Sequence, residues 1–271
     1  MALQAFRWWV LLRTAAIDLS LWKTIECHFA ASFYALVLPG ASAQEIVRAV
    51  LLSRQVDYAV VWGSTWLSKL LGLVGWMVVG LLGLAIEAQL LNLGSFDVRA
   101  LLLASAAVLS IALAASFSKR LTRPIRLLSE RIVPTPLLKK LAVIRDAVYV
   151  FRTQYRALIY AIITTLCIQL SLVLGTAIVL YGIIGQFFFW PFAAILALIE
   201  VTIVIVPLTP GGIGIREGLL ALLFTHIGIG TEEVSVYIAL CFLGTLSRLV
   251  GGISVALGRI SKNVETPAKI D

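Results

Sequence analysis

Charged side chains inside long apolar stretches are the residues of this chain that could do chemistry, because a charge in lipid is costly and usually serves a function. They are Glu45, Arg48, Lys69, Glu200, Arg216, Glu217 and Arg248. With four basic and three acidic members, the group keeps a surplus of one positive charge, which suits an anionic headgroup. Internal ion pairs, or side chains that reach the membrane interface, are the alternative for these residues.

The spacing of these charged residues indicates which of them could form ion pairs with each other. Glu45 and Arg48 are three residues apart, so on a helix they would share a face and could pair. Arg216 and Glu217 are adjacent and point in different directions, so each needs another partner. Glu200 or Glu217 could serve as a general base, but no nucleophile, metal-binding set or cofactor motif accompanies them. We therefore expect ligand binding and no enzymatic activity.

A proline- and glycine-rich segment from Val206 to Gly218 interrupts the apolar sequence around Arg216. A helix beginning near Ile213 would point its unpaired N–H groups and its positive dipole end into this break, where an anion could bind. A close crossing of two helices through small residues is the alternative. The candidate substrate-binding residues are Arg216, Glu217, Arg248, Gly211, Gly212, Gly214, Thr209, Pro210, Glu200, Glu45, Arg48 and Lys69.

The elements that position these residues must lie in lipid. The chain is 61% hydrophobic and 13% charged, whereas soluble domains are about half apolar and about a quarter charged. Its apolar stretches are continuous and do not alternate, which favours helices over the strands of a barrel. The expected fold is all-α, a polytopic transmembrane helical bundle of about 6–7 spans of about 20 residues each, with some segments broken or re-entrant.

The remaining composition favours no cofactor and no nucleic acid. Cys27, Cys167 and Cys241 are isolated in apolar surroundings, as small core residues are. His28 and His226 have no second ligand at helical spacing, so a zinc or haem site is not expected. The net charge of +8 is concentrated in one loop beside the spans, where it reports topology and not nucleic-acid binding.

A basic segment divides the single integral membrane domain 1–271 into two halves. Residues 118–156 carry most of the excess of Lys and Arg, so the positive-inside rule predicts that this loop lies in the cytoplasm. We expect the chain to cross the cell (inner) membrane several times. The halves are residues 1–117 and 157–258, followed by a cytoplasmic tail, 259–271. We expect spans at 70–91, 100–117, 157–180 and 236–257, and either two full spans or one re-entrant hairpin over 192–206 and 213–229.

The two halves contain a short internal repeat. Residues 67–72, Leu-Ser-Lys-Leu-Leu-Gly, match residues 246–251, Leu-Ser-Arg-Leu-Val-Gly, and each copy follows a Pro-Gly break. In the expected topology the helix with Lys69 runs outward and the helix with Arg248 runs inward, so the copies are inverted. Inverted repeats with interrupted helices are typical of transporters with a binding site near the membrane midplane. A chance recurrence of a short apolar string is the alternative.

Residues 207–218, Pro-Leu-Thr-Pro-Gly-Gly-Ile-Gly-Ile-Arg-Glu-Gly, resemble the signature of the lysylphosphatidylglycerol synthase transmembrane-region family, also called the flippase-like domain. The stretch from Arg7-Trp8 to Leu12 and the segment Leu38-Pro39-Gly40, with Glu45 and Arg48 after it, are similar to the family's first half. Two features depart from the family pattern. Residues 41–44, Ala-Ser-Ala-Gln, replace glycines, with Glu45 in place of an Asp, and the chain begins late, so the N-terminus is expected to be shortened.

The resemblance implies a flippase-like transporter that moves an anionic or amino-acylated phospholipid, or a lipid-linked precursor, between leaflets. Arg216, Arg248 and Lys69 would contact the headgroup, and membrane lipids would be the main partners. The alternative is a non-catalytic membrane accessory of a lipid-modifying enzyme such as a glycosyltransferase. A scaffold or channel is a third class, for which no selectivity-filter motif is present.

Overall fold

The computed structural model describes residues 1–38, 40, 42–53, 56–87, 100, 102–107, 109–110, 148, 151–205 and 209–256. Within them every named element is a helix, which confirms the all-α prediction. The elements are α1 (Ala2–Thr14), α2 (Leu21–Tyr34), α3 (Ala43–Leu52), α4 (Tyr58–Ile86), η1 (Phe151–Thr153), α8 (Tyr155–Ile184), α9 (Trp190–Ile205), α10 (Ile215–His226), α11 (Thr231–Leu246), η2 (Ser247–Leu249) and α12 (Val250–Ala256). Residues 118–147 of the basic loop 118–156, and the tail, 259–271, lie outside the described residues.

Three helical stretches are long and apolar enough to cross a membrane: Tyr58–Ile86, Tyr155–Ile184 and Thr231–Ile253, the last of which joins α11, η2 and most of α12. The first begins earlier than the sequence suggested, at Tyr58 instead of residue 70, because the Asp57 carboxylate caps it by accepting the Val60 N–H. Lys69 therefore lies well inside this helix and not at its start. The chain is therefore a multi-pass membrane protein.

Two pairs of shorter helices flank the Pro-Gly breaks. α2 and α3 have 14 and 10 residues, and α9 and α10 have 16 and 12, so none reaches the about 20 residues that a full span needs. Each pair is a hairpin broken near its middle, at Gly40 in the first half and at residues 209–214 in the second. For the second pair, this favours the re-entrant alternative over two full spans.

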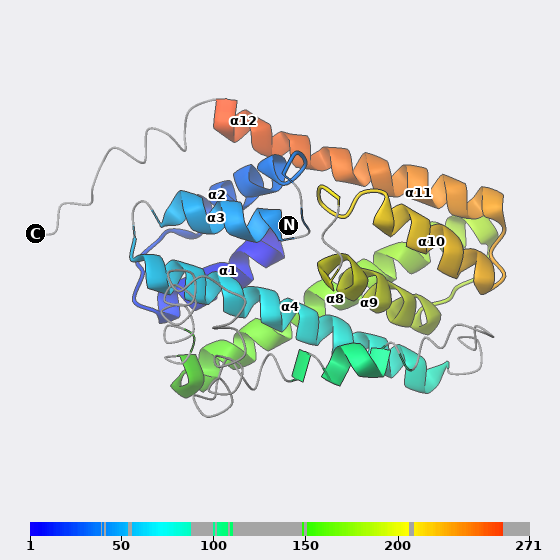
Figure 1. Ribbon diagram of the computed structural model, residues 1–271, viewed down its shortest axis with the longest axis horizontal. Helices are drawn as coiled ribbons and strands as arrows, with labels where there is room; N and C mark the ends of the chain where they lie inside the picture. Colours follow the sequence, from blue (N-terminus) through cyan, green and yellow to red (C-terminus); the bar gives the residue numbers. More distant parts are fainter. Residues whose placement is uncertain are drawn as a thin grey trace, which may run out of the picture.

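The long helices that carry the two copies of the repeat, α4 and α11 with α12, run in opposite directions, and each packs on a helix of the other half. In Figure 1, α4 and α8 run from left to right and α11 with α12 runs from right to left. α4 of the first half packs along α9 of the second, and its counterpart α12 packs along α2 of the first half. The helices that open the halves, α1 and α8, pack on each other. This exchange is the arrangement expected of an inverted repeat.

Glycines allow the closest of these contacts, between α4 and α9. A Cβ on Gly83 would collide with the Trp190 carbonyl oxygen, and one on Gly80 with the Cβ of Ala197. Leu102 packs in the same cluster, beside the buried residues of α9 such as Phe192 and Leu198. Small residues give helices in lipid their tight packing, so this contact forms the core that joins the halves.

Candidate functional site

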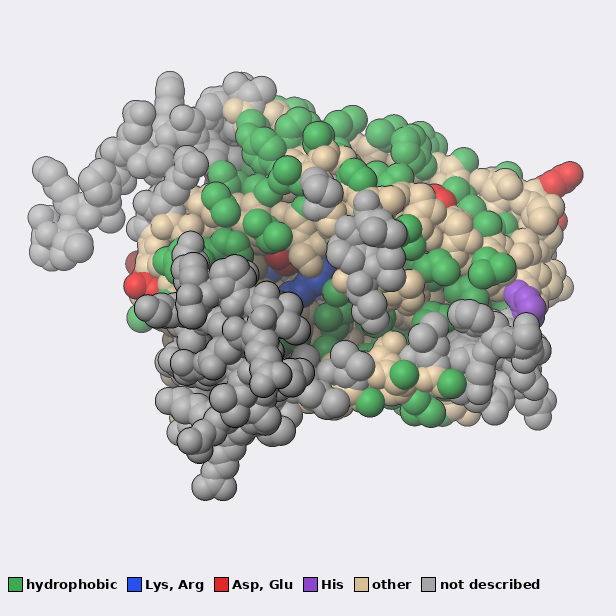
Figure 2. Space-filling view, viewed as in Figure 1, with side chains coloured by type: hydrophobic (Ala, Val, Ile, Leu, Met, Phe, Trp, Pro, Cys, Tyr) green, Lys and Arg blue, Asp and Glu red, His purple; other side chains and the backbone are tan. Residues whose placement is uncertain are grey.

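A cavity of about 480 Å³ lies between the two halves. Its polar wall includes Arg7 of α1, Gln44 and Glu45 of α3, Lys69 of α4, Gln169 of α8, Glu200 of α9, Arg216 of α10 and Arg248 of η2. Figure 2 shows Lys or Arg and Asp or Glu side chains at the bottom of a hollow near the middle of one face, with hydrophobic side chains around it. Charged groups from helices distant in sequence are thus gathered in one place.

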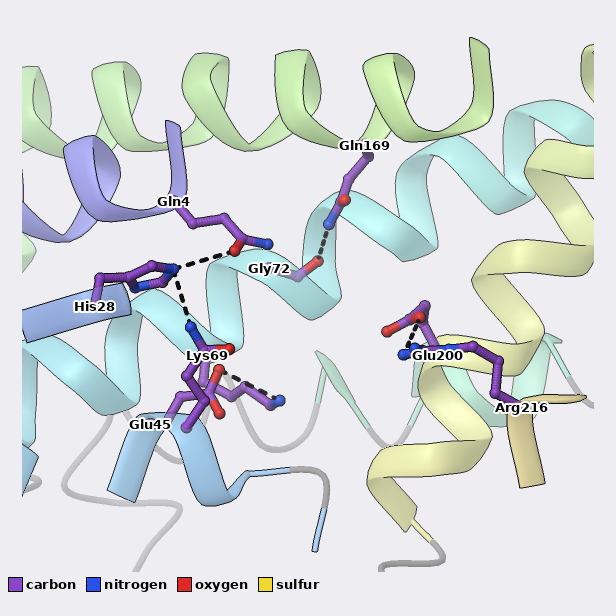
Figure 3. Close-up of polar contacts among 9 residues, drawn as sticks. Gln4, His28, Glu45, Lys69, Gly72, Gln169, Glu200 and Arg216 are labelled. Atoms are coloured by element: carbon purple, nitrogen blue, oxygen red, sulfur yellow. Dashed lines mark hydrogen bonds and ion pairs between the residues drawn. The ribbon is translucent and has the colours of Figure 1, made fainter. Parts of the chain in front are cut away.

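Two ion pairs stand on opposite sides of this space (Figure 3). The Arg216 Nη2 donates to the Glu200 Oε1 at 3.0 Å, and the Lys69 Nζ lies 3.6 Å from the Glu45 Oε1. Each pair joins a short helix at a break to a neighbouring helix of the same half. The four side chains are between one fifth and one third exposed, so they are neither free in water nor sealed in the core.

Two further arginines line the cavity without a carboxylate partner among the described residues. The Arg7 Nη1 donates to the Thr165 hydroxyl at 3.0 Å, and its guanidinium lies against Gly72, 3.5 Å from the place a Cβ would occupy. Arg248 lies in the same way against Gly211, at 3.5 Å. Glycine at both positions leaves room for the guanidinium groups to reach the cavity wall.

Arg48 is buried away from the cavity, which overturns the expected pairing with Glu45. Its side chain is 2% exposed, and its Cζ lies 4.7 Å from the centre of the Trp8 ring. A cation over an aromatic face is stabilised by the ring quadrupole. The Glu45 carboxylate instead lies beside Lys69 of α4. Arg48 is therefore part of the packed interior and does not line the cavity.

Most N–H groups of the second break already form hydrogen bonds within the protein. The N–H groups of Gly212 and Ile213 bond to the carbonyl oxygens of Thr209 and Pro210, and the Glu217 carboxylate accepts the Gly214 N–H. Glu217 thus caps α10, which begins at Ile215 and not at Ile213 as expected. The chain's own carboxylate thus binds one of the N–H groups at the helix end where an anion site was predicted.

Of the candidate residues predicted from sequence, six line the cavity: Glu45, Lys69, Glu200, Gly211, Arg216 and Arg248. The other six do not, and the structure assigns them local positions. Thr209 and Pro210 meet Gly40 in the contact between the two breaks, Gly212 packs on Ile203, and Gly214 has φ of 91° at the start of α10. Arg48 and Glu217 have the positions given above.

Sequence analysis missed Arg7 and a set of glutamines in the wall. The Gln169 Nε2 donates to the Gly72 carbonyl oxygen at 3.0 Å, and Gln4 and Gln44 both lie within hydrogen-bond distance of the buried His28 Nε2 (Figure 3). The sequence feature that could have indicated these residues is their type, an arginine and single glutamines within apolar runs. Among the described residues, no group of three His, Cys, Asp or Glu side chains could hold a metal ion.

Comparison with protein families matches residues 1–250 to the lysylphosphatidylglycerol synthase TM region. No curated protein and no solved structure matches the chain. The family match covers both breaks, both ion pairs and all of the cavity wall. The chain therefore belongs to the lysylphosphatidylglycerol synthase transmembrane-region family.

Proposed function

We propose that this protein is a flippase-like transporter that moves a lipid with an anionic headgroup, such as an anionic or amino-acylated phospholipid or a lipid-linked precursor, between leaflets. The observation that carries the proposal is the charged cavity between two inverted halves. Arg216, Arg248, Lys69 and Arg7 would contact the headgroup, and Glu45 and Glu200 would hold two of these cations in place.

The position of the cavity supports access from the bilayer. The three long helical stretches run along the long axis of Figure 1, so the membrane normal follows that axis. The hollow in Figure 2 lies midway along the same axis, on a side of the molecule and not at an end. A headgroup that enters sideways can leave its acyl chains in the hydrocarbon, which is the geometry that leaflet exchange needs.

The contact between the breaks supports a moving site. Inverted halves with interrupted helices at the midplane are typical of transporters that rock one half against the other. Here the broken hairpins touch at Gly40 and Pro210, and the cavity includes Gly40 and Gly211 from the two sides of that contact. Movement at the breaks would change the shape of the headgroup site.

The proposal extends to partners and orientation. Leaflet exchange requires no covalent step, so the chain itself would not be an enzyme, and a lipid-modifying enzyme is the partner that the family's name suggests. We place the protein in the cell membrane with the basic loop and the C-terminus in the cytoplasm, because short loops rich in Lys and Arg stay on that side.

Leaflet exchange in proteoliposomes tests the proposal. Purified full-length protein should accelerate the exposure of a fluorescent anionic phospholipid to an external quencher, and the variant Arg216→Ala with Arg248→Ala should abolish that exchange. Arg13→Ala is the matched control, because Arg13 is exposed and pairs only with Asp18. Unchanged exchange by the folded double variant would show that the cavity arginines have no part in transport.

A further inference from the structure

We infer that the headgroup taken up by this cavity carries two negative charges on phosphate, as a lipid phosphate monoester or diphosphate does. This inference rests on the proposed function and narrows its substrate class. A phosphodiester such as phosphatidylglycerol carries one negative charge, and an amino-acylated derivative adds positive charge to it. The cavity distinguishes these three classes by its own charge.

The charge balance of the wall is the first step. Among the described residues that line the cavity, four side chains are basic, Arg7, Lys69, Arg216 and Arg248, and two are acidic, Glu45 and Glu200. Two positive charges therefore remain among these side chains, and the amino group of Met1, which also lines the cavity, adds to them. The two neighbouring charged residues outside the wall, Arg48 and Glu217, have opposite signs and leave this surplus unchanged.

The distribution of that surplus is the second step. Lys69 and Arg216 have carboxylate partners, so their charges are compensated within the protein. Among the residues that the structure describes, Arg7 and Arg248 have no carboxylate at ion-pair distance, and the Arg7 Nε is buried without a hydrogen-bond acceptor. An uncompensated guanidinium at this depth is costly, and arginine does not deprotonate to escape the cost. Two arginines that both lack an ion pair suit a headgroup with two negative charges.

The geometry of both arginines is the third step. Arg7 lies against Gly72 on α4, and Arg248 lies against Gly211 at the second break, so the two come from opposite halves of the repeat. The planar guanidinium offers several N–H donors at fixed angles and binds phosphate oxygens in pairs. A phosphate monoester offers three non-ester oxygens and two charges to such donors, whereas a diester offers two oxygens and one charge.

The carboxylates argue against an amino-acylated headgroup. An added ammonium group would need an acidic partner, and the Glu200 Oε1 and the Glu45 Oε1 already bind Arg216 and Lys69. The Glu45 Oε2 is buried without a hydrogen-bond partner, so an ammonium group could compete at that oxygen. The amino-acylated lipid is therefore an explicit arm of the test.

Equilibrium binding to full-length protein in detergent tests the inference. The probes are dihexanoyl phosphatidic acid, dihexanoyl phosphatidylglycerol, its lysyl derivative and glycerol 3-phosphate, measured by calorimetry in one buffer. We expect phosphatidic acid to bind about tenfold more tightly than phosphatidylglycerol, and the lysyl derivative to bind most weakly. Glycerol 3-phosphate, with the same charge but no chains, should bind more weakly than phosphatidic acid.

Variants test whether Arg7 and Arg248 cause the preference for phosphatidic acid. Arg248→Gln and Arg7→Gln should each remove most of the preference for phosphatidic acid, while Arg7→Lys, which keeps the charge, should retain it. Arg13→Gln is the matched control, since that side chain is exposed at the surface. Glu45→Gln removes a wall carboxylate and should increase the preference, which separates a charge effect from loss of fold.

The outcomes separate this inference from the proposed function. Equal or tighter binding of phosphatidylglycerol or of its lysyl derivative would overturn the inference, even where the protein exchanges those lipids between leaflets. Glycerol 3-phosphate binding as tightly as phosphatidic acid would also overturn it, because the site would then take a soluble phosphate. Selective binding of phosphatidic acid without leaflet exchange of any lipid would keep the inference and refute the transporter.

Discussion

Gly40 and Pro210 form a parallel β-bridge, and the Gly40 N–H donates to the Thr209 carbonyl oxygen at 3.3 Å. This contact joins the break of the first half directly to the break of the second. A backbone that leaves a helix inside a membrane must find partners in the protein, since lipid supplies none. Here each break supplies a hydrogen-bond partner for a backbone group of the other break, and the cavity opens beside this contact.

Gly212 of the second break and Gly218 of the helix after it should differ in their tolerance of substitution. Gly212 has φ of 79°, and a Cβ there would collide with the Ile203 side chain, so Gly212→Ala should lower the free energy of unfolding by about 1–3 kcal/mol. Gly218 lies in α10 with open space around it, so Gly218→Ala should be neutral or slightly stabilising. Thermal unfolding in one detergent compares the two variants. Equal midpoints would show that the break is not packed as described.

The contact between the halves gives a second comparison within long helices. Gly83→Ala places a Cβ against the Trp190 carbonyl oxygen and the Ala194 N–H, and α4 must then move away from α9. Gly175→Ala, in α8, meets nothing within 4 Å. We expect the first variant to unfold at a lower temperature, by about 1–3 kcal/mol of stability, as overpacking does in cores, and the second to match the unaltered protein. A stable Gly83→Ala protein would contradict the close α4–α9 contact.

Sequence could predict the fold class and the breaks because both depend on local composition. Continuous apolar runs specify helices in lipid, and the run of Pro and Gly at residues 207–214 interrupts one wherever it falls. The repeat at 67–72 and 246–251 even indicated the inverted arrangement. The start of α4 at Tyr58 was missed, because it depends on a single cap, Asp57, in a stretch whose hydrophobicity changes little.

The partners within the site could not be predicted in the same way. Glu45 and Arg48 share a helical face, yet the Glu45 carboxylate goes to Lys69 from another helix. The register between α3 and α4 decides that choice, and no local pattern encodes it. Likewise Arg7 enters the site only because α1 packs on α8, where Thr165 accepts its N–H. Residue type indicated that charges would gather, and tertiary packing decided which of them face the cavity.

The orientation of the chain gives a third prediction. The excess of Lys and Arg in 118–156 should hold that loop in the cytoplasm, and α11, which begins at Thr231, should then start at the outer face. Single cysteines at Glu232 and at Lys139, in a protein otherwise free of cysteine, should differ in whole cells. A membrane-impermeant maleimide should label the first without lysis and the second only after lysis. The reverse pattern would invert the topology.

The ion pair between Glu200 and Arg216 should have a larger coupling energy than a surface ion pair in a double-mutant cycle. Glu200→Gln and Arg216→Gln each leave a partly buried charge without its partner, whereas the double variant removes both charges. The double variant should therefore lose less stability than the sum of the single variants, with a coupling energy of about 0.5–3 kcal/mol. The same cycle on Arg13 and Asp18, whose side chains are 55% and 93% exposed, should give a coupling energy of about 0–1 kcal/mol, because solvent screens that pair. Midpoints of thermal or denaturant unfolding supply both cycles. Additive losses at Glu200 and Arg216 would mean that the pair is as weakly coupled as the one at the surface, and that Arg216 is as free as Arg248 to bind a ligand.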